Sequence, residues 1–238
     1  MWKGHPGLRG VLRMKLNLSK PILYLITRGA TTQQTTRDNP EFAAILSQIS
    51  AAVAAGVDVC QIREKELTTR VLVELVTAAS RLTRGTNTRL LVNDRADVAA
   101  GAGADGVHLT TRSLEAASIR PAFGDKFLIG VSTHALSEAR AARDQGADFI
   151  VFGPVFETES KIGFGPPAGR QKLAEVARDL REFPVLALGG ISLQNAPDCL
   201  MAGAAGIAGI SIFDRPEGLN DVCEQIRNPT RSADHRRL

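Results

Sequence analysis

The sequence predicts an α/β fold of the (β/α)8 TIM-barrel class in a single domain. Three observations predict it: eight short apolar segments alternate with eight segments of helical pattern, one glycine junction recurs four times, and aromatic residues make up only 5% of the 238 residues. Strict alternation of strands and helices implies a parallel sheet, and eight such units in a chain of this length imply a closed barrel. A doubly wound open sheet also alternates and is the alternative, although it rarely needs eight units.

The expected strands are short runs that are nearly all apolar, which is typical of parallel strands buried on both faces. In chain order they are residues 21–27, 57–62, 90–92, 106–109, 127–132, 149–152, 185–188 and 206–212.

Between these runs, apolar residues recur at helical spacing. The expected helices are residues 42–55, 70–82, a short helix after 94, one from about 113, then 135–145, 170–181, 193–202 and 217–226. Pro40 suits the first turn of the first helix, and Thr68 or Thr69 can cap the second.

The repeated junction joins a helix to the following strand. It reads Ala-Gly-Val-Asp at 55–58, Ala-Gly-Ala-Asp at 102–105, Gln-Gly-Ala-Asp at 145–148 and Ala-Gly-Ala-Ala at 202–205. Each glycine is expected to end its helix with a positive φ angle. Four matching junctions support a fold made of repeated units.

The formal net charge of +4 is concentrated at the two ends of the chain. We therefore expect a flexible basic extension at 1–20, a catalytic barrel domain at 21–226 and a basic tail at 227–238. A nucleic-acid partner is not expected, because such binding needs basic residues clustered on the fold itself.

The three cysteines, Cys60, Cys199 and Cys223, are odd in number and lack metal-ligand spacing. We expect reduced thiols in a cytoplasmic protein. No run approaches the roughly 20 apolar residues of a membrane span, so no membrane partner is expected. A homo-oligomer is compatible with the sequence, which does not fix the oligomeric state.

In a barrel of this kind, the active site lies at the carboxyl ends of the strands. Gln61, Arg63 and Lys65 follow the second expected strand, and Asn93 and Asp94 follow the third. The cations suit a diphosphate, and Asp94 is a candidate ligand for Mg²⁺, which usually takes one or two carboxylates together with phosphate oxygens.

Ser132 and His134 follow the fifth expected strand, where His134 is a candidate general acid or base. The sixth strand opens into a loop that carries Thr158, Ser160 and Lys161. A loop of more than a dozen residues within a compact domain is usually functional. We expect it to lie over the reacting centre.

The seventh and eighth strands end in glycine-rich segments that include Gly190, Ile210 and Ser211. Glycine-rich ends of these two strands make the usual phosphate site of such barrels, because unpaired N–H groups at a helix start attract an anion. Tight turns without a ligand are the alternative.

The strand ends also carry a set of short motifs. They are Gln61-Ile-Arg-Glu-Lys65, Val92-Asn-Asp-Arg95, Gly103-Ala-Asp-Gly-Val-His-Leu109, Gly130-Val-Ser-Thr-His134, Gly153-Pro-Val-Phe156, Gly189-Gly190 and Ser211. Together they resemble the thiamine-phosphate synthase/TenI superfamily, in register from about residue 21 to 213.

The resemblance implies an enzyme that joins hydroxymethylpyrimidine diphosphate to thiazole phosphate and releases pyrophosphate with Mg²⁺. It places two groups of residues around the diphosphate and the reacting atoms: Gln61, Arg63, Lys65, Asn93 and Asp94 on the diphosphate and the metal, and Ser132, Thr158, Ser160 and Lys161 around the reaction. Gly190, Ile210 and Ser211 would hold the thiazole phosphate.

The sequence departs from the synthase pattern after His108-Leu109. Synthases usually read Gly-Gln-x-Asp there, and the Asp is a second magnesium ligand; this chain has Thr110, Thr111, Arg112 and Ser113. A TenI-like thiazole tautomerase, which needs no metal and would use His134 as its acid and base, is therefore the alternative. A non-catalytic regulator that binds thiamine phosphates is a second alternative.

Overall fold

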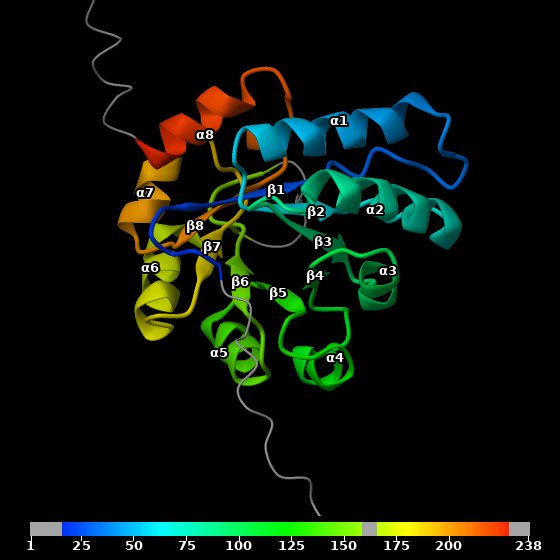
Figure 1. Cartoon of the computed structure of the whole chain (residues 1–238). Coiled ribbons are helices and arrows are strands. Elements are labelled where there is room, and N and C mark those ends of the chain that lie inside the picture. Colours follow the sequence, from blue (N-terminus) through cyan, green and yellow to red (C-terminus); the bar gives the residue numbers. More distant parts are fainter. Residues whose placement is uncertain (1–15, 159–165, 229–238) are drawn as a thin grey trace, which may run out of the picture.

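The chain folds as a closed barrel of eight parallel strands surrounded by helices, which confirms the predicted class (Figure 1). The structure is a computed structural model and describes residues 16–158 and 166–228. The strands β1 to β8 are Ile22–Ile26, Val59–Ile62, Arg89–Asn93, Gly106–Leu109, Leu128–Thr133, Phe149–Phe152, Val185–Ala187 and Gly206–Gly209. The barrel closes where β1 pairs in parallel with β8, with Leu25 opposite Gly209.

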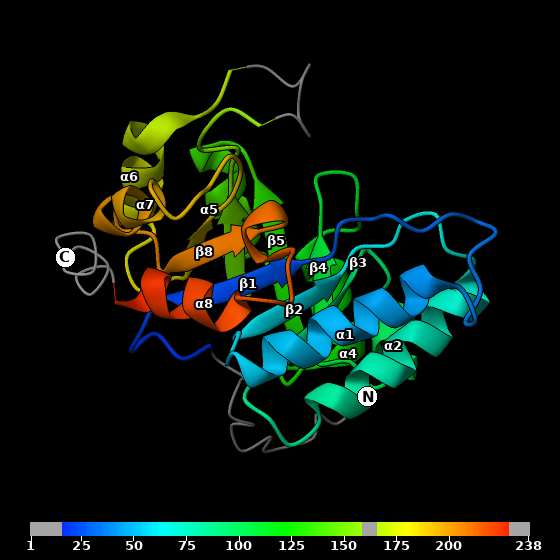
Figure 2. The same cartoon turned by 90° about the horizontal axis from the view of Figure 1, so that it is seen from above.

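The helices lie outside the ring of strands. They are α1 Pro40–Ala54, α2 Thr69–Thr83, α3 Ala96–Gly101, α4 Ala116–Phe123, α5 Leu136–Asp144, α6 Gly169–Asp179, α7 Ala196–Met201 and α8 Leu219–Arg227. Figure 2 shows the two longest, α1 and α2, side by side along one flank of the barrel. The Thr68 hydroxyl accepts a hydrogen bond from the Val71 amide at 3.4 Å, so Thr68 caps α2 as predicted.

Three elements differ from the expectation by three residues at one end, and one of them is α7, which begins at Ala196 instead of residue 193. The eighth strand ends at Gly209 instead of residue 212, because Ile210 leaves the extended conformation and Ser211–Phe213 form the short 3-10 helix η2. The fourth helix begins at Ala116 instead of about residue 113. Ser113 holds a turn there, because its hydroxyl accepts a hydrogen bond from the Thr110 amide at 2.6 Å.

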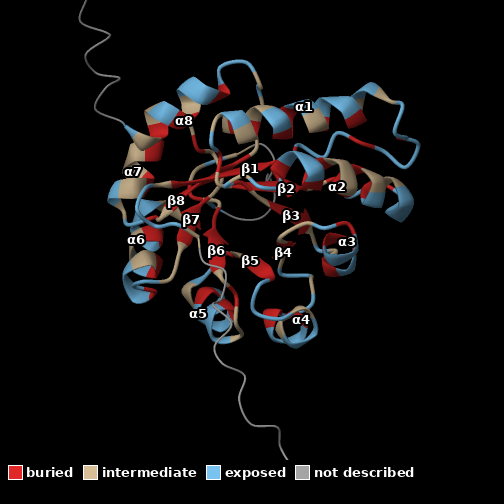
Figure 3. Ribbon diagram, in the orientation of Figure 1, coloured by how far each residue is buried: buried red, intermediate tan, exposed pale blue. Residues whose placement is uncertain are grey.

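Two layers of apolar side chains hold the barrel together. One layer fills the space between the strands and the helices, and the other fills the barrel interior. In Figure 3 the strands are coloured almost entirely as buried, whereas the helices carry many exposed residues. Inside the barrel the Tyr24 and Phe149 rings pack edge to face, with centroids 5.7 Å apart. The interior is therefore a packed core. In barrels of this class the active site lies at the carboxyl ends of the strands, here called the upper end, and the strands begin at the lower end.

The repeated junction has a second function that the glycines alone do not explain. Gly56, Gly103, Gly146 and Gly203 all have positive φ angles, as predicted. In three of the four junctions the aspartate accepts a hydrogen bond from the amide of the second residue of the preceding strand: Asp58 from Leu23 N, Asp105 from Leu90 N and Asp148 from Ile129 N, at 2.7–2.9 Å. Each aspartate also pairs with an arginine, so the lower end of the barrel is held by three ionic clamps.

The clamp at Asp148 is the most buried of the three. Its carboxylate lies 2.6 Å from the Arg120 guanidinium, and the two side chains are 5% and 15% exposed. We expect Asp148→Ala to lower the free energy of unfolding by about 3 kcal/mol, because it leaves the charge of the largely buried Arg120 without its carboxylate partner and the Ile129 amide without its acceptor.

Asp144→Ala is the matched control, because Asp144 pairs with Arg143 on the surface and is 64% exposed. Surface pairs contribute little, so chemical denaturation should show no measurable change for this variant. Equal losses in the two variants would contradict the clamp.

The expected extension at 1–20 and the tail at 227–238 fall largely outside the described residues, and these boundaries stay predictions. Within residues 16–158 and 166–228, no helix combines the length and the apolar character that a bilayer crossing requires.

Candidate active site

The polar side chains at the carboxyl ends of β1, β2 and β3 form one continuous hydrogen-bonded row. The buried Tyr24 hydroxyl donates to Gln61 Oε1 at 2.8 Å, and Gln61 Nε2 donates to Asn93 Oδ1 at 2.9 Å. Asn93 Nδ2 then donates to Asp94 Oδ2 at 2.8 Å. The row fixes the orientation of both amides and leads from the barrel interior to an exposed carboxylate.

Asp94 has an unusual backbone conformation for a residue other than glycine, with φ at 60°. Its Oδ1 atom accepts a hydrogen bond from the Ser113 hydroxyl and lies 3.5 Å from Thr110 Oγ1. Non-glycine residues held in this region cluster at functional sites. Ser113, at the position where the resemblance implies a second carboxylate, is in direct contact with the Asp94 carboxylate.

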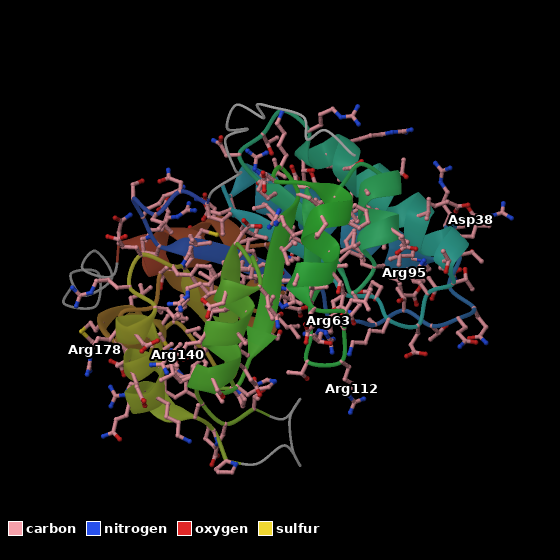
Figure 4. All side chains as sticks on the ribbon, turned by 90° about the horizontal axis from the view of Figure 1, so that it is seen from below. Asp38, Arg63, Arg95, Arg112, Arg140 and Arg178 are labelled. Carbon is pink, nitrogen blue, oxygen red and sulfur yellow. The ribbon has the colours of Figure 1, made fainter. Side chains whose placement is uncertain are left out.

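Arg63 and Lys65 follow β2 at the same end of the barrel. Lys65 is exposed and Arg63 is half-buried. The Arg63 guanidinium passes over Gly29, where an added Cβ would lie 3.3 Å from Nη1. In Figure 4 Arg63 lies apart from Arg140 and Arg178, which belong to the side of α5 and α6.

Glu64, between these two cations, was not singled out for a role by the sequence. It is only 4% exposed. Its carboxylate accepts four hydrogen bonds, from the Thr27 and Thr31 hydroxyls at 2.6 and 2.7 Å and from the Gly29 and Thr31 amides at 3.1 and 3.2 Å. Glu64 therefore fixes the loop after β1 against the end of β2, and this positions Arg63.

Ser132 on β5 meets His108 on β4. His108 Nε2 lies 2.9 Å from Ser132 Oγ. The imidazole is 3% exposed and packs against Tyr24 and Phe149. Burial lowers the pKa of His108 to about 4, so the ring is neutral near pH 7.

His134 lies just beyond β5 and is exposed. Its Nδ1 atom is hydrogen-bonded to the Gly153 carbonyl, and its amide donates to Glu138 at 2.7 Å. A carbonyl accepts only, so Nδ1 carries a proton, and in the neutral form of the ring it is Nε2 that presents a lone pair. This is the arrangement of a base held in a fixed orientation.

Gly189 and Gly190 follow β7 and both have positive φ angles, 98° and 64°. Their α-carbons lie against the segment after β6: an added Cβ would come 2.6 Å from Pro154 at Gly189 and 2.2 Å from the Glu157 carbonyl at Gly190. The glycines thus let the start of the long loop pack closely on the end of β7, and their predicted contact with a phosphate stays a prediction.

Not every predicted residue is placed. Thr158 is half-buried at the described end of the loop, whereas Ser160 and Lys161 lie outside the described residues. Ile210 and Ser211 enter the 3-10 turn after β8, and Ser211 is exposed. The structure thus joins Gln61, Asn93 and Asp94 in one hydrogen-bonded row and places Ser132 in a hydrogen bond with His108.

These residues can be tested for fit to Mg²⁺. Within the described ranges no three His, Cys, Asp or Glu side chains form a metal-binding cluster. Asp94 offers one carboxylate at an exposed position, with the Ser113 and Thr110 hydroxyl oxygens beside it. Mg²⁺ commonly binds through one or two carboxylates together with substrate phosphates and waters, so the residues fit a metal that arrives with its phosphate ligand.

A parallel eight-stranded barrel with cations, amides and a carboxylate at the carboxyl ends of its strands defines an enzyme of the TIM-barrel class. The chain belongs to the thiamine monophosphate synthase family, whose model matches residues 23–213. The predicted superfamily is thereby confirmed.

Individual relatives agree with the family. The chain is 50% identical over 167 residues to a protein of Geobacter sulfurreducens whose own assignment as a thiamine-phosphate synthase is provisional, covering 70% of this chain and 78% of that one. It is 42% identical over 168 residues to the thiamine-phosphate synthase of Roseiflexus sp. (strain RS-1), covering 71% of each. Among solved structures, thiamine phosphate pyrophosphorylase from Pyrococcus furiosus is similar with a TM-score of 0.70 and 29% identity, over 88% of this chain and 98% of the other.

The close approach at Gly190 can be tested by a single methyl group. We expect Gly190→Ala to displace the segment at Glu157 and to lower both stability and activity. Gly85→Ala is the matched control, because Gly85 also has a positive φ of 78° but has no atom within 4 Å of an added Cβ. Both variants carry the backbone strain of about 1 kcal/mol, so a larger loss for Gly190→Ala in thermal unfolding isolates the contact, and equal losses would argue against it.

The neutral state of His108 predicts a pH dependence of stability. Its pKa is about 4 in the folded chain, below the ordinary 6.5. Between pH 4 and 6.5 the unfolded chain therefore binds a proton at His108 that the native chain does not. The free energy of unfolding is highest above about pH 6.5 and decreases as the pH falls towards 4.

The measurement is the free energy of unfolding against pH for the parent and for His108→Gln. As the pH falls from 6.5 to 4, the free energy of unfolding of the parent should decrease relative to that of His108→Gln, which lacks the titrating group. Parallel curves over that range would show that His108 is not held neutral.

Proposed function

We propose that the chain is a thiamine-phosphate synthase, a transferase that couples hydroxymethylpyrimidine diphosphate to thiazole phosphate and releases pyrophosphate. In this reaction the bond between the pyrimidine methylene carbon and the diphosphate oxygen breaks. The thiazole nitrogen forms a new bond to that carbon, and the electron pair leaves with pyrophosphate.

The proposal is carried by one observation: a chain of this family keeps Gln61, Asn93 and Asp94 as a connected row beside Arg63. Negative charge grows on the departing diphosphate, and fixed donors and cations aimed at that charge lower the barrier. In the proposal Arg63, Lys65 and Lys161 supply the cations, and the Gln61 and Asn93 amides orient the diphosphate.

Mg²⁺, when bound, would neutralise part of the diphosphate charge, with Asp94 as its protein ligand. Ser132, Thr158 and Ser160 are proposed to contact the reacting groups, and Gly190, Ile210 and Ser211 to hold the thiazole phosphate. His134 has no proton to move in this coupling step, and its role as acid and base belongs to the tautomerase alternative below.

Release of pyrophosphate from the two substrates and Mg²⁺ is the direct assay. Asp94→Asn should reduce the rate by about a hundredfold, the scale expected when one group that stabilises developing charge is lost. Asp97→Asn is the matched control, because Asp97 is exposed and pairs with Arg95. The proposal fails if the folded parent releases no pyrophosphate, or if both variants lose activity equally.

A thiazole tautomerase is the second candidate, because Ser113 occupies the place of the second carboxylate and His134 has a fixed imidazole. It predicts turnover of thiazole carboxylate phosphate without metal, with collapse in His134→Ala. Turnover that survives chelation and is lost in that variant, together with no release of pyrophosphate, would favour this candidate over the synthase.

A further inference from the structure

His108 and Ser132 share a hydrogen bond whose donor can be inferred from the surroundings of the imidazole ring. His108 Nε2 and Ser132 Oγ are 2.9 Å apart, and either atom could donate. A neutral imidazole carries one proton on one of its two nitrogens, so the partner of the other nitrogen decides which.

The other nitrogen, Nδ1, is buried and has no hydrogen-bond partner among the described residues. It faces the backbone of Gly130, where an added Cβ would be 2.8 Å away, and the Phe149 ring closes the same space. A buried N–H without an acceptor is a rare and costly arrangement in folded proteins, and an idle acceptor is tolerated better. The proton therefore belongs on Nε2.

With its proton on Nε2, His108 donates to Ser132 Oγ. The Ser132 oxygen then accepts the hydrogen bond from His108, and the hydroxyl proton of Ser132 is free to point towards the open end of the barrel. Ser132 is half-buried, so its hydroxyl is within reach of a ligand there. The opposite tautomer would draw the serine proton inward and turn oxygen lone pairs towards the ligand.

We propose that His108 is a positioning residue that fixes Ser132 as a hydrogen-bond donor to an anionic oxygen of the phosphorylated substrate. The inference deepens the proposed function and rests on it for the identity of the anion. A serine that both accepts and donates is polarised, because hydrogen bonds in a chain strengthen each other. A hydrogen bond in this direction therefore leaves Ser132 as a donor, which is what a negatively charged ligand oxygen requires.

The direction of the bond can be measured without substrate. In protein with ¹⁵N-labelled histidine, two-bond ¹H–¹⁵N correlation spectra at pH 7 distinguish the two neutral tautomers, and the signals of His108 are those lost in His108→Gln. The expected result is a proton on Nε2 and none on Nδ1. A proton on Nδ1, or a charged ring, would overturn the proposal whatever the protein catalyses.

Two substitutions separate positioning from packing. His108→Phe keeps an aromatic ring against Tyr24 and Phe149 but removes the donor, whereas His108→Gln loses the ring and keeps an N–H at similar reach. The affinity for inorganic pyrophosphate with Mg²⁺, measured by calorimetry, should fall by about tenfold or more in His108→Phe, because a hydrogen bond to a charged group is lost, and by clearly less in His108→Gln.

Ser132→Ala should weaken pyrophosphate binding in the parent and add little in the His108→Phe background, because both changes remove the same oriented hydrogen bond from Ser132 to the ligand. In the synthase assay, kcat should fall in the same order across the variants. If His108→Phe binds like the parent while His108→Gln is impaired, His108 serves only packing and the proposal is wrong. If the tautomer and binding results hold but no pyrophosphate is released, only the proposed function fails.

Discussion

The pairing of polar side chains inside the upper end of the barrel is the constraint on which the site depends. A buried polar group without a partner costs free energy, and this barrel places a tyrosine, a glutamine, a glutamate and a histidine close to its packed interior. Each is paired across strands: Tyr24 with Gln61, Glu64 with the loop after β1, and His108 with Ser132. These pairings reduce the freedom of the side chains that face the ligand, so the site is oriented before a ligand arrives.

The lower end of the barrel solves a different problem with different chemistry. There the strands begin, and three aspartates of the repeated junctions accept an amide near the start of the preceding strand while arginines neutralise the carboxylates. The fold thus separates stabilising ion pairs at one end from the residues proposed for binding at the other. In such barrels, residues that stabilise the fold usually lie at the face where the strands begin, and catalytic residues lie at the face where the strands end.

The sequence was enough to predict the closed barrel, because its buried parallel strands are short apolar runs and glycines mark the junctions between helices and strands. The pair of His108 with Ser132 was not predicted, although strand register contains it: His108 lies opposite Gly130, and Ser132 is two residues further on the same face. The function of Glu64 was missed because its partners follow β1, about 35 residues earlier, and only the closed barrel brings them together.

The departure at Ser113 has a physical counterpart in the structure. Its hydroxyl bonds to Asp94 instead of adding a second charge, which suits a metal that is held largely by its phosphate ligand. The most direct test of the account is ³¹P NMR of the folded protein with hydroxymethylpyrimidine diphosphate, thiazole phosphate and Mg²⁺ in one sample. The account predicts that the substrate diphosphate signals are replaced by inorganic pyrophosphate while one phosphate monoester remains; unchanged diphosphate signals would contradict it.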